Sequence, residues 1–244
     1  MVAASLCIAA ASVSDGLRIG AFSAADPARD LPKDWERLTL SKADRQTSYD
    51  LVAVDTTVAV RAVSRGGASG LIRRQRIDPT AYPMLTWRWR VKGPIAGGNA
   101  FTKDGDDFAA RLFVTFDHDP GLGGRLKRSA LRALGYDDVP TRALNYVWAN
   151  RAPTDTVFAS AHTDWVQMIP VERGSTRAGA WVVETRNVRA DYRRAFGEAP
   201  PAITGVALMT DTDNTGGSAT AYYGDIVLHR AARDTPVNLD PHRD

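Results

Sequence analysis

Several segments of the chain alternate large apolar residues with polar or charged ones, a period-two pattern typical of half-buried strands. In residues 84–91, tryptophans alternate with arginines. Residues 106–116 and 181–188 are similar segments that combine apolar and charged residues. Turn-forming Gly, Pro, Asp and Asn separate most of these segments. The strand candidates are 50–54, 57–64, 70–77, 84–91, 108–116, 144–149, 157–161, 165–169, 180–188, 203–210 and 219–229.

Short strands at regular intervals predict an all-β fold, a β-sandwich of the jelly-roll type, similar in architecture to carbohydrate-binding modules. One domain over residues 17–230 accommodates all of them. Residues 125–134 have apolar positions at helical spacing, and residues 189–196 precede Gly197, a typical helix C-cap. We therefore expect one or two short helices in the connections.

The two ends of the chain differ in composition from the middle. Residues 1–16 are apolar and small, resemble a secretory signal and contain the only cysteine, Cys7. We expect export to the periplasm or the medium, with a cytoplasmic location as the alternative. No stretch approaches the ~20 apolar residues of a transmembrane helix. The polar residues 231–244 predict a disordered tail.

Composition narrows the partners only slightly. The net charge of +3 over 244 residues is too small to indicate a nucleic-acid partner. The four histidines show no zinc-ligand spacing, and the glycine-rich segment 121–124 lacks the strand-loop-helix context of a nucleotide site. No nucleotide or organic cofactor is therefore expected, and the sequence leaves the oligomeric state open.

Arginines and one glutamate at alternating strand positions predict a charged sheet face. The residues are Arg88, Arg90, Arg111, Glu184 and Arg186. Two explanations fit them: a cross-strand charge ladder that needs no ligand, or a cleft in which arginine forks recognise a polar or anionic ligand. Among the six tryptophans, Trp148 is the best candidate for an exposed aromatic platform.

Two acidic segments are candidate cation or catalytic sites. Asp211, Asp213 and Asn214 follow an apolar strand, and their closely spaced oxygens suit calcium. An EF-hand is excluded, because the twelfth position of the loop, where an EF-hand has a bidentate glutamate, is occupied here by Tyr222. The alternative to a calcium site is a hairpin loop with Asx turns. In an enzyme, Asp107 and Glu184 could act as acid and base on a glycosidic bond.

Motifs along almost the whole chain resemble a bacterial family known as domain of unknown function 3047. The motifs are residues 82–91, 106–112, 146–149, 184–188, 191–192, 196–197 and 209–215. The resemblance implies a common fold, in exported bacterial proteins, and supplies no catalytic residues.

Three functions remain open at this point. The leading hypothesis is an exported protein that binds a polysaccharide or another polar ligand on a charged and aromatic sheet face. The alternatives are a carboxylate-based glycoside hydrolase or lyase, and a structural periplasmic protein stabilised by calcium. The glycan element rests on analogy with other sandwich folds.

Overall fold

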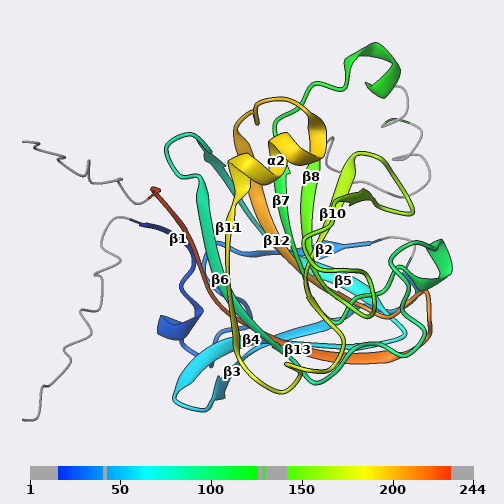
Figure 1. The fold of residues 1–244 in the computed structure, drawn as a ribbon. Helices are drawn as coiled ribbons and strands as arrows, with labels where there is room; N and C mark the ends of the chain where they lie inside the picture. Colours follow the sequence, from blue (N-terminus) through cyan, green and yellow to red (C-terminus); the bar gives the residue numbers. More distant parts are fainter. Residues whose placement is uncertain (1–15, 41–42, 126–128, 130–141, 232–244) are drawn as a thin grey trace, which may run out of the picture.

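The chain folds into two β-sheets packed face to face, a β-sandwich of the jelly-roll type, as expected (Figure 1). The computed structural model describes residues 16–40, 43–125, 129 and 142–231. The signal-like segment, except Gly16, and the predicted tail, except residue 231, lie outside these residues. Within the described residues, no helix has both the length and the apolar character needed to cross a membrane.

The first sheet, sheet A, contains six strands. In spatial order these are β11 (Val182–Asn187), β6 (Met84–Val91), β13 (Ser218–His229), β4 (Thr57–Arg65) and β3 (Ser48–Val54), with β1 (Gly16–Gly20) also paired to β13. All pairings are antiparallel. Strand β11 therefore forms one edge of the sheet.

The second sheet, sheet B, contains seven strands. In spatial order these are β2 (Glu36–Thr39), β5 (Ala68–Ile77), β12 (Ile203–Asp211), β7 (Arg111–Phe116), β8 (Ala143–Ala149), β10 (Val166–Arg173) and β9 (Phe158–Ala159). Only β8 and β10 run parallel; the other pairs are antiparallel.

Aromatic side chains join the two sheets where β6 lies over β8. The rings of Trp87 and Tyr146 are 5.2 Å apart, and those of Trp89 and Trp148 are 6.1 Å apart. All four are buried. The alternation in β6 thus turns its tryptophans inward and its arginines outward. Such rings remove large apolar areas from water and dominate the core.

Short helices occupy the connections. Helix α2 (Val188–Phe196) begins where the Asn187 side chain accepts a hydrogen bond from the Ala190 amide at 3.0 Å. It ends at Gly197, whose φ of 75° is the left-handed conformation that glycine adopts easily. Residues 121–125 are also helical, but most of the helix predicted over 125–134 lies outside the described residues.

The sequence-predicted strands differ from the observed ones mainly before β7 and at the start of the chain. Residues 108–110 are not part of β7. The Phe108 carbonyl accepts from the Asp211 amide of β12, but the Phe108 amide donates to the Asp211 side chain instead of a backbone carbonyl, so the regular ladder is not continued. The short strands β1 and β2 were not expected. Both lie beside longer strands, β1 against β13 and β2 against β5.

Candidate functional site

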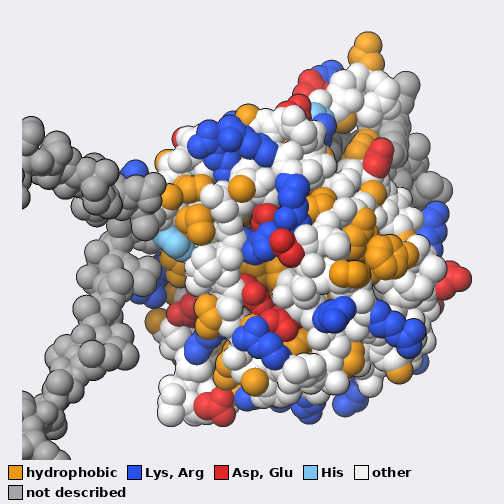
Figure 2. Space-filling model, in the orientation of Figure 1, with side chains coloured by type: hydrophobic (Ala, Val, Ile, Leu, Met, Phe, Trp, Pro, Cys, Tyr) orange, Lys and Arg blue, Asp and Glu red, His pale blue; other side chains and the backbone are white. Residues whose placement is uncertain are grey.

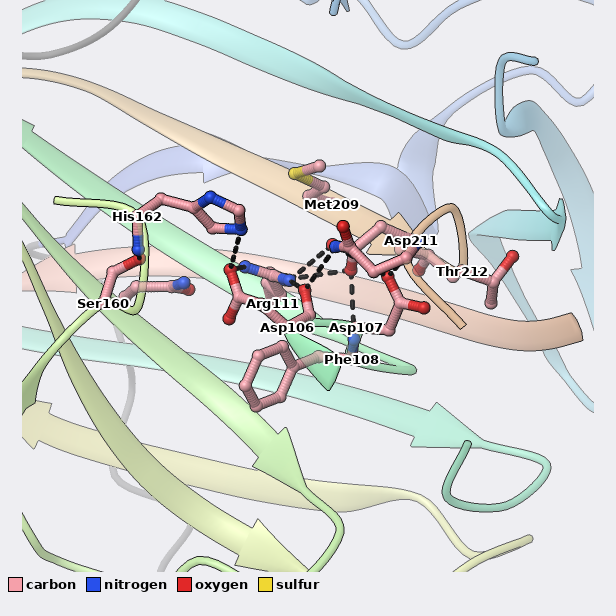
Figure 3. Close-up of polar contacts among 12 residues, drawn as sticks. Asp106, Asp107, Phe108, Arg111, Ser160, His162, Met209, Asp211 and Thr212 are labelled. Atoms are coloured by element: carbon pink, nitrogen blue, oxygen red, sulfur yellow. Dashed lines mark hydrogen bonds and ion pairs between the residues drawn. The ribbon is translucent and has the colours of Figure 1, made fainter. Parts of the chain in front are cut away.

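Arg111 lies at the centre of a buried acidic cluster on the outer side of sheet B (Figure 3). Its guanidinium forms a bidentate pair with Asp211, in which Nε donates to Oδ1 at 2.9 Å. It also donates to the backbone oxygen of Asp106 and lies 3.6 Å from that carboxylate. The Phe108 ring lies 4.3 Å from its carbon Cζ. The expected open, ligand-facing position of Arg111 is therefore wrong: it is an internal counter-ion.

Asp107 is occupied in a different way. Its carboxylate accepts hydrogen bonds from the backbone amides of Asn214, at 3.2 Å, and Thr215, at 2.7 Å, and from the Thr215 hydroxyl at 2.6 Å. These bonds hold the β12–β13 turn. Asp107 precedes β7 of sheet B, whereas Glu184 lies on the edge strand of sheet A. Among the described residues the two carboxylates make no contact, so the structure does not bring this predicted pair together.

Three carboxylates of this region approach one another. Oxygens of Asp107, Asp211 and Asp213 lie within 4.8 Å of each other, so the group could hold a metal ion. Burial raises the pKa of Asp211, and the positive charge of Arg111 opposes the shift. Partial desolvation of its carboxyl also raises the pKa of Asp213, although the residue as a whole is exposed. Asn214, expected to be a ligand, instead donates to Asp107.

His162 borders the same cluster from the connection between β9 and β10. Its Nε2 lies 3.5 Å from Oδ2 of Asp106, and Figure 3 shows the ring pointing toward that carboxylate. The other oxygen of Asp106 is buried and has no hydrogen-bond partner among the described residues.

A second group of charges lies at the edge of the sandwich, between β11 and β10. We call it the edge cluster: Glu184, Arg186, Glu172, Arg177, Asp155, Asp191 and Arg194. Figure 2 shows acidic and basic side chains gathered around hydrophobic ones in a hollow in the middle of this face, between β11 and β10.

Glu184 is the least satisfied member of the edge cluster. It pairs with Trp87 across β11 and β6, which turns its side chain toward the inside of the sandwich. Its Oε1 is buried and has no partner among the described residues, and neither do the indole N–H groups of Trp87 and Trp89. Burial, reinforced by the charge of Glu172, raises its pKa to about 7, although the nearby indole of Trp89 opposes the shift.

The other charges of the edge cluster compensate one another. Arg186 makes a bidentate pair with Asp191, at 2.6 and 2.8 Å, and contacts Asp155 at 3.0 Å. Asp155 also pairs with Arg194 at 3.1 Å. Glu172 forms an ion pair with Arg177. Paired charges of this kind can hydrogen-bond a polar ligand without attracting one of a particular sign.

Arg88 and Arg90 lie on the opposite side of sheet A. In register, Arg88 faces Val183 rather than Glu184. The Arg88 guanidinium lies 4.9 Å from the Trp181 ring, and Arg90 lies 4.6 Å from that of Tyr222. The predicted single charged face is therefore wrong, because the register assigns Arg88 and Arg90 to the outer side and Glu184 and Arg186 to the inner side.

Trp148 is not an exposed platform. Its ring is fully buried against Trp89, and its indole N–H donates to the Gly174 carbonyl at 3.0 Å. Every residue of β8 is buried, because segments outside sheet B cover the face that would otherwise reach solvent. The prediction of an exposed ring at this position is wrong.

Sequence reasoning did not find several members of the edge cluster. Glu172 follows Pro170 and a register shift in β10, so simple alternation does not place it. Asp191 stands in the first turn of α2, where an acidic residue is favourable in any helix. Glu172 and Asp191 join the edge cluster only because tertiary folding brings β10 and α2 next to β11, and no local sequence pattern indicates this.

Comparisons with solved structures found matches at low similarity. A family 11 carbohydrate-binding module of a Clostridium thermocellum cellulase is 11% identical, with a TM-score of 0.44 over 88% of this chain and 95% of that one. A family 12 xyloglucanase of Bacillus licheniformis is 8% identical, with a TM-score of 0.43 over 81% and 94%. The Emp47p carbohydrate recognition domain is 10% identical, with a TM-score of 0.43 over 91% and 100%.

These TM-scores lie below 0.5, and structural similarity this low does not support inferring the function of one protein from that of another. Among curated proteins, none matches the chain. The family described as "Protein of unknown function (DUF3047)" matches residues 33–227, which span both sheets. The chain belongs to this family.

Proposed function

We propose that the chain binds a hydroxyl-rich ligand, a segment of a glycan, at the edge cluster between β10 and β11. One observation carries the proposal: the half-buried Glu184 carboxyl, whose inner oxygen makes no hydrogen bond of normal geometry among the described residues, and neither do the indole N–H groups of Trp87 and Trp89, although the Trp89 indole lies close enough to lower the pKa of Glu184. Buried polar groups in folded proteins are nearly always hydrogen-bonded, so three together indicate a place where hydroxyls or water supply the missing bonds.

The charges around Glu184 favour a neutral ligand over an ionic one. Arg186 and Arg177 already face carboxylates, so the cluster has little net attraction for an anion. Their remaining N–H groups and the carboxylate oxygens still offer donors and acceptors to hydroxyls. Location outside the cytoplasm, inferred from residues 1–16, is part of the proposal and would bring the protein into contact with polysaccharides.

The binding test uses the whole chain against immobilised neutral polysaccharides of bacterial and plant origin. Glu184→Gln replaces the carboxyl by an amide of the same size, and we expect at least a tenfold loss of affinity. The matched control is Val183→Thr, the next residue, whose side chain points to the opposite, exposed side of β11. Equal binding by the native chain and Glu184→Gln, with both folded, would reject the proposal.

A second candidate function is hydrolysis of a glycosidic bond, which the position of Glu172 favours. A carboxyl with a raised pKa and an ionised carboxylate beside it are the two groups that such a reaction needs. Here Glu184, with a pKa of about 7, would donate the proton, and Glu172, beside Arg177, would be the base or nucleophile. Asp107, the partner expected from the sequence, is locked into a turn.

Mass spectrometry of the soluble fraction separates the two functions. New oligosaccharides that vanish in both Glu184→Gln and Glu172→Gln would establish an enzyme. Their absence, with a polysaccharide still retained by the native chain, would establish a binding protein. Hydrolysis that survives both substitutions would exclude this pair of carboxyls.

A structural calcium role would use Asp107, Asp211 and Asp213. However, the oxygens of Asp107 and Asp211 already accept hydrogen bonds from N–H and O–H donors, and Arg111 places a positive charge at the cluster. We propose that the Arg111 guanidinium takes the place of a bound calcium ion in this cluster. Calcium is the alternative, and a melting experiment decides between them.

A further inference from the structure

A second hollow lies on the outer side of sheet A, at the end of the β3–β4 pair and away from the edge cluster. It has a volume of about 700 Å³. Its lining contains three arginines and only one apolar residue: Arg45, Gln46, Ser48, Arg61, Val63 and Arg65. None of these residues entered the expectations drawn from sequence, because two of the arginines lie on one strand and Arg45 precedes another.

Backbone register explains why these side chains share one face. Arg61, Val63 and Arg65 alternate along β4, so they point to the same side of the sheet. Ser48 pairs with Val63 across β3 and β4, which adds its hydroxyl to the same surface. The hollow is thus built on two paired strands, and Arg45 and Gln46 extend it just before β3.

The hollow carries an excess of positive charge. Arg61 is compensated by Asp50, with hydrogen bonds of 3.1 and 2.5 Å. Arg45 and Arg65 are exposed and have no acidic partner in the described part of the chain. This contrasts with Arg88 and Arg90 on the same sheet, which are stacked on aromatic rings.

Spacing indicates a ligand with several anionic groups. Arg61 and Arg65 are four residues apart on one strand, about 13 Å at the usual rise per residue. Over such a distance, a repeating chain can place one anion near each arginine. The arginine fork matches planar and tetrahedral oxyanions.

The other groups of the hollow select among polyanions. Single-stranded nucleic acids bind through bases stacked on open aromatic rings. On this face, the Tyr222 and Trp181 rings are both covered by Arg90, at 4.6 and 5.4 Å. Gln46 and Ser48 instead offer hydrogen bonds suited to sugar hydroxyls. We propose that this hollow binds an acidic polysaccharide, through the carboxylate or sulfate groups of successive sugars.

The experiment measures binding of the whole chain to polygalacturonate, which carries carboxylates, and to dextran sulfate. Neutral dextran and oligo(dT) serve as comparison ligands. We expect binding to at least one acidic polysaccharide, with affinity that falls as salt rises. Arg45→Gln combined with Arg65→Gln should reduce that affinity at least tenfold.

The matched control is Arg37→Gln combined with Arg76→Gln. It removes the same net charge from surface arginines of β2 and β5, on the other sheet, that pair with Asp30 and Asp117. We expect it to keep most of the affinity. Glu184→Gln should also keep it, which separates this hollow from the edge cluster.

Three results would overturn the inference. The first is no binding to either acidic polysaccharide, and the second is an equal loss in the two double variants. The third is tighter binding of oligo(dT) than of both acidic polysaccharides, which would assign the hollow to nucleic acid. Thermal melting of each variant establishes that it is folded before its affinity is interpreted.

Discussion

The Tyr146 hydroxyl donates a 2.9 Å hydrogen bond to Oδ2 of Asp191, inside the sandwich. The same carboxylate accepts both arms of the Arg186 fork. One buried carboxylate on α2 therefore joins sheet B, through β8, to the edge strand of sheet A. The edge cluster depends on this link, because Arg186 and Glu184 are neighbours on β11.

Tyr146→Phe should weaken the fold, because it removes a buried donor from a carboxylate. Hydrogen bonds to charged groups contribute about 1.5–3 kcal/mol, so we expect a loss of that size in the free energy of unfolding. Denaturant titration measures it. Tyr222→Phe is the control, since its ring contacts Arg90 and its hydroxyl has no hydrogen bond among the described residues. Equal effects in both variants would contradict the assigned role.

Arg111→Met should destabilise the chain strongly. It leaves the Asp211 and Asp106 carboxylates buried without their counter-ion, a change that typically costs about 3–5 kcal/mol. Adding Asp211→Asn removes one of those stranded charges and should restore part of the loss. A double variant that is less stable than Arg111→Met alone, by denaturant titration, would speak against this charge balance.

Glu184 should make stability fall as pH rises. Its folded pKa of about 7 lies above the ordinary value of 4.5, so the folded state holds the proton more tightly than the unfolded state. Its favourable contribution is fully present below pH 4.5 and is lost as pH rises toward about 7. Because the side chain is partly exposed, we expect roughly 1–2 kcal/mol.

Unfolding titrations of native chain and Glu184→Gln at pH 5 and pH 8 measure that contribution. The difference in stability between them should shift in favour of the variant at the higher pH. A shift in the opposite direction would mean that the carboxyl is held ionised in the folded chain.

Calcium should leave the melting temperature unchanged relative to a chelator. A ligand that binds only the folded state raises stability, so a bound ion would reveal itself directly. We expect no rise, because Arg111 already pairs with Asp106 and Asp211 and places a positive charge at the cluster. A rise that disappears in Asp213→Asn, whose carboxyl is the exposed member of the cluster, would establish the calcium site instead.

Gly224→Ala should displace Arg88. A Cβ at this position would lie 2.3 Å from Nε of Arg88, closer than any real contact. The guanidinium would leave the Thr57 hydroxyl, at 3.1 Å, and the Trp181 ring. We expect a modest loss of stability, about 1 kcal/mol, and altered tryptophan fluorescence. Fluorescence identical to that of the native chain would show that Arg88 keeps its place.

Alternation predicted most strands because these segments bury one face and expose the other. Strand β6 is the clearest case: its tryptophans are buried and its arginines are not. Alternation did not predict the start of β7, where a backbone amide bonds to a side chain instead of to the next strand. Before β7, the Phe108 amide bonds to the Asp211 carboxylate, and no local pattern indicates a partner about 100 residues away.

The charged face was mispredicted for a different reason. Parity within a strand shows which residues share a side, but it does not relate one strand to the next. Arg88 and Glu184 each followed their own alternation correctly, and the β6–β11 register then placed them on opposite sides. In β8 parity is uninformative, because both faces are covered and Trp148 is buried with all its neighbours.

The pairing of β1 with β13 has a mechanical consequence. Gly16 lies opposite His229, so β1 and β13, the first and last strands of the described residues, reach the same end of an antiparallel pair (Figure 1). A pulling force applied to both strands at that end would break the hydrogen bonds between them one after another. We therefore expect β1 to detach from β13 at low force, although the core contains large buried rings such as Trp87, Trp89 and Trp148. For the same reason, a short linker across these strands would give a permuted chain that could begin at the exposed Asp55 turn.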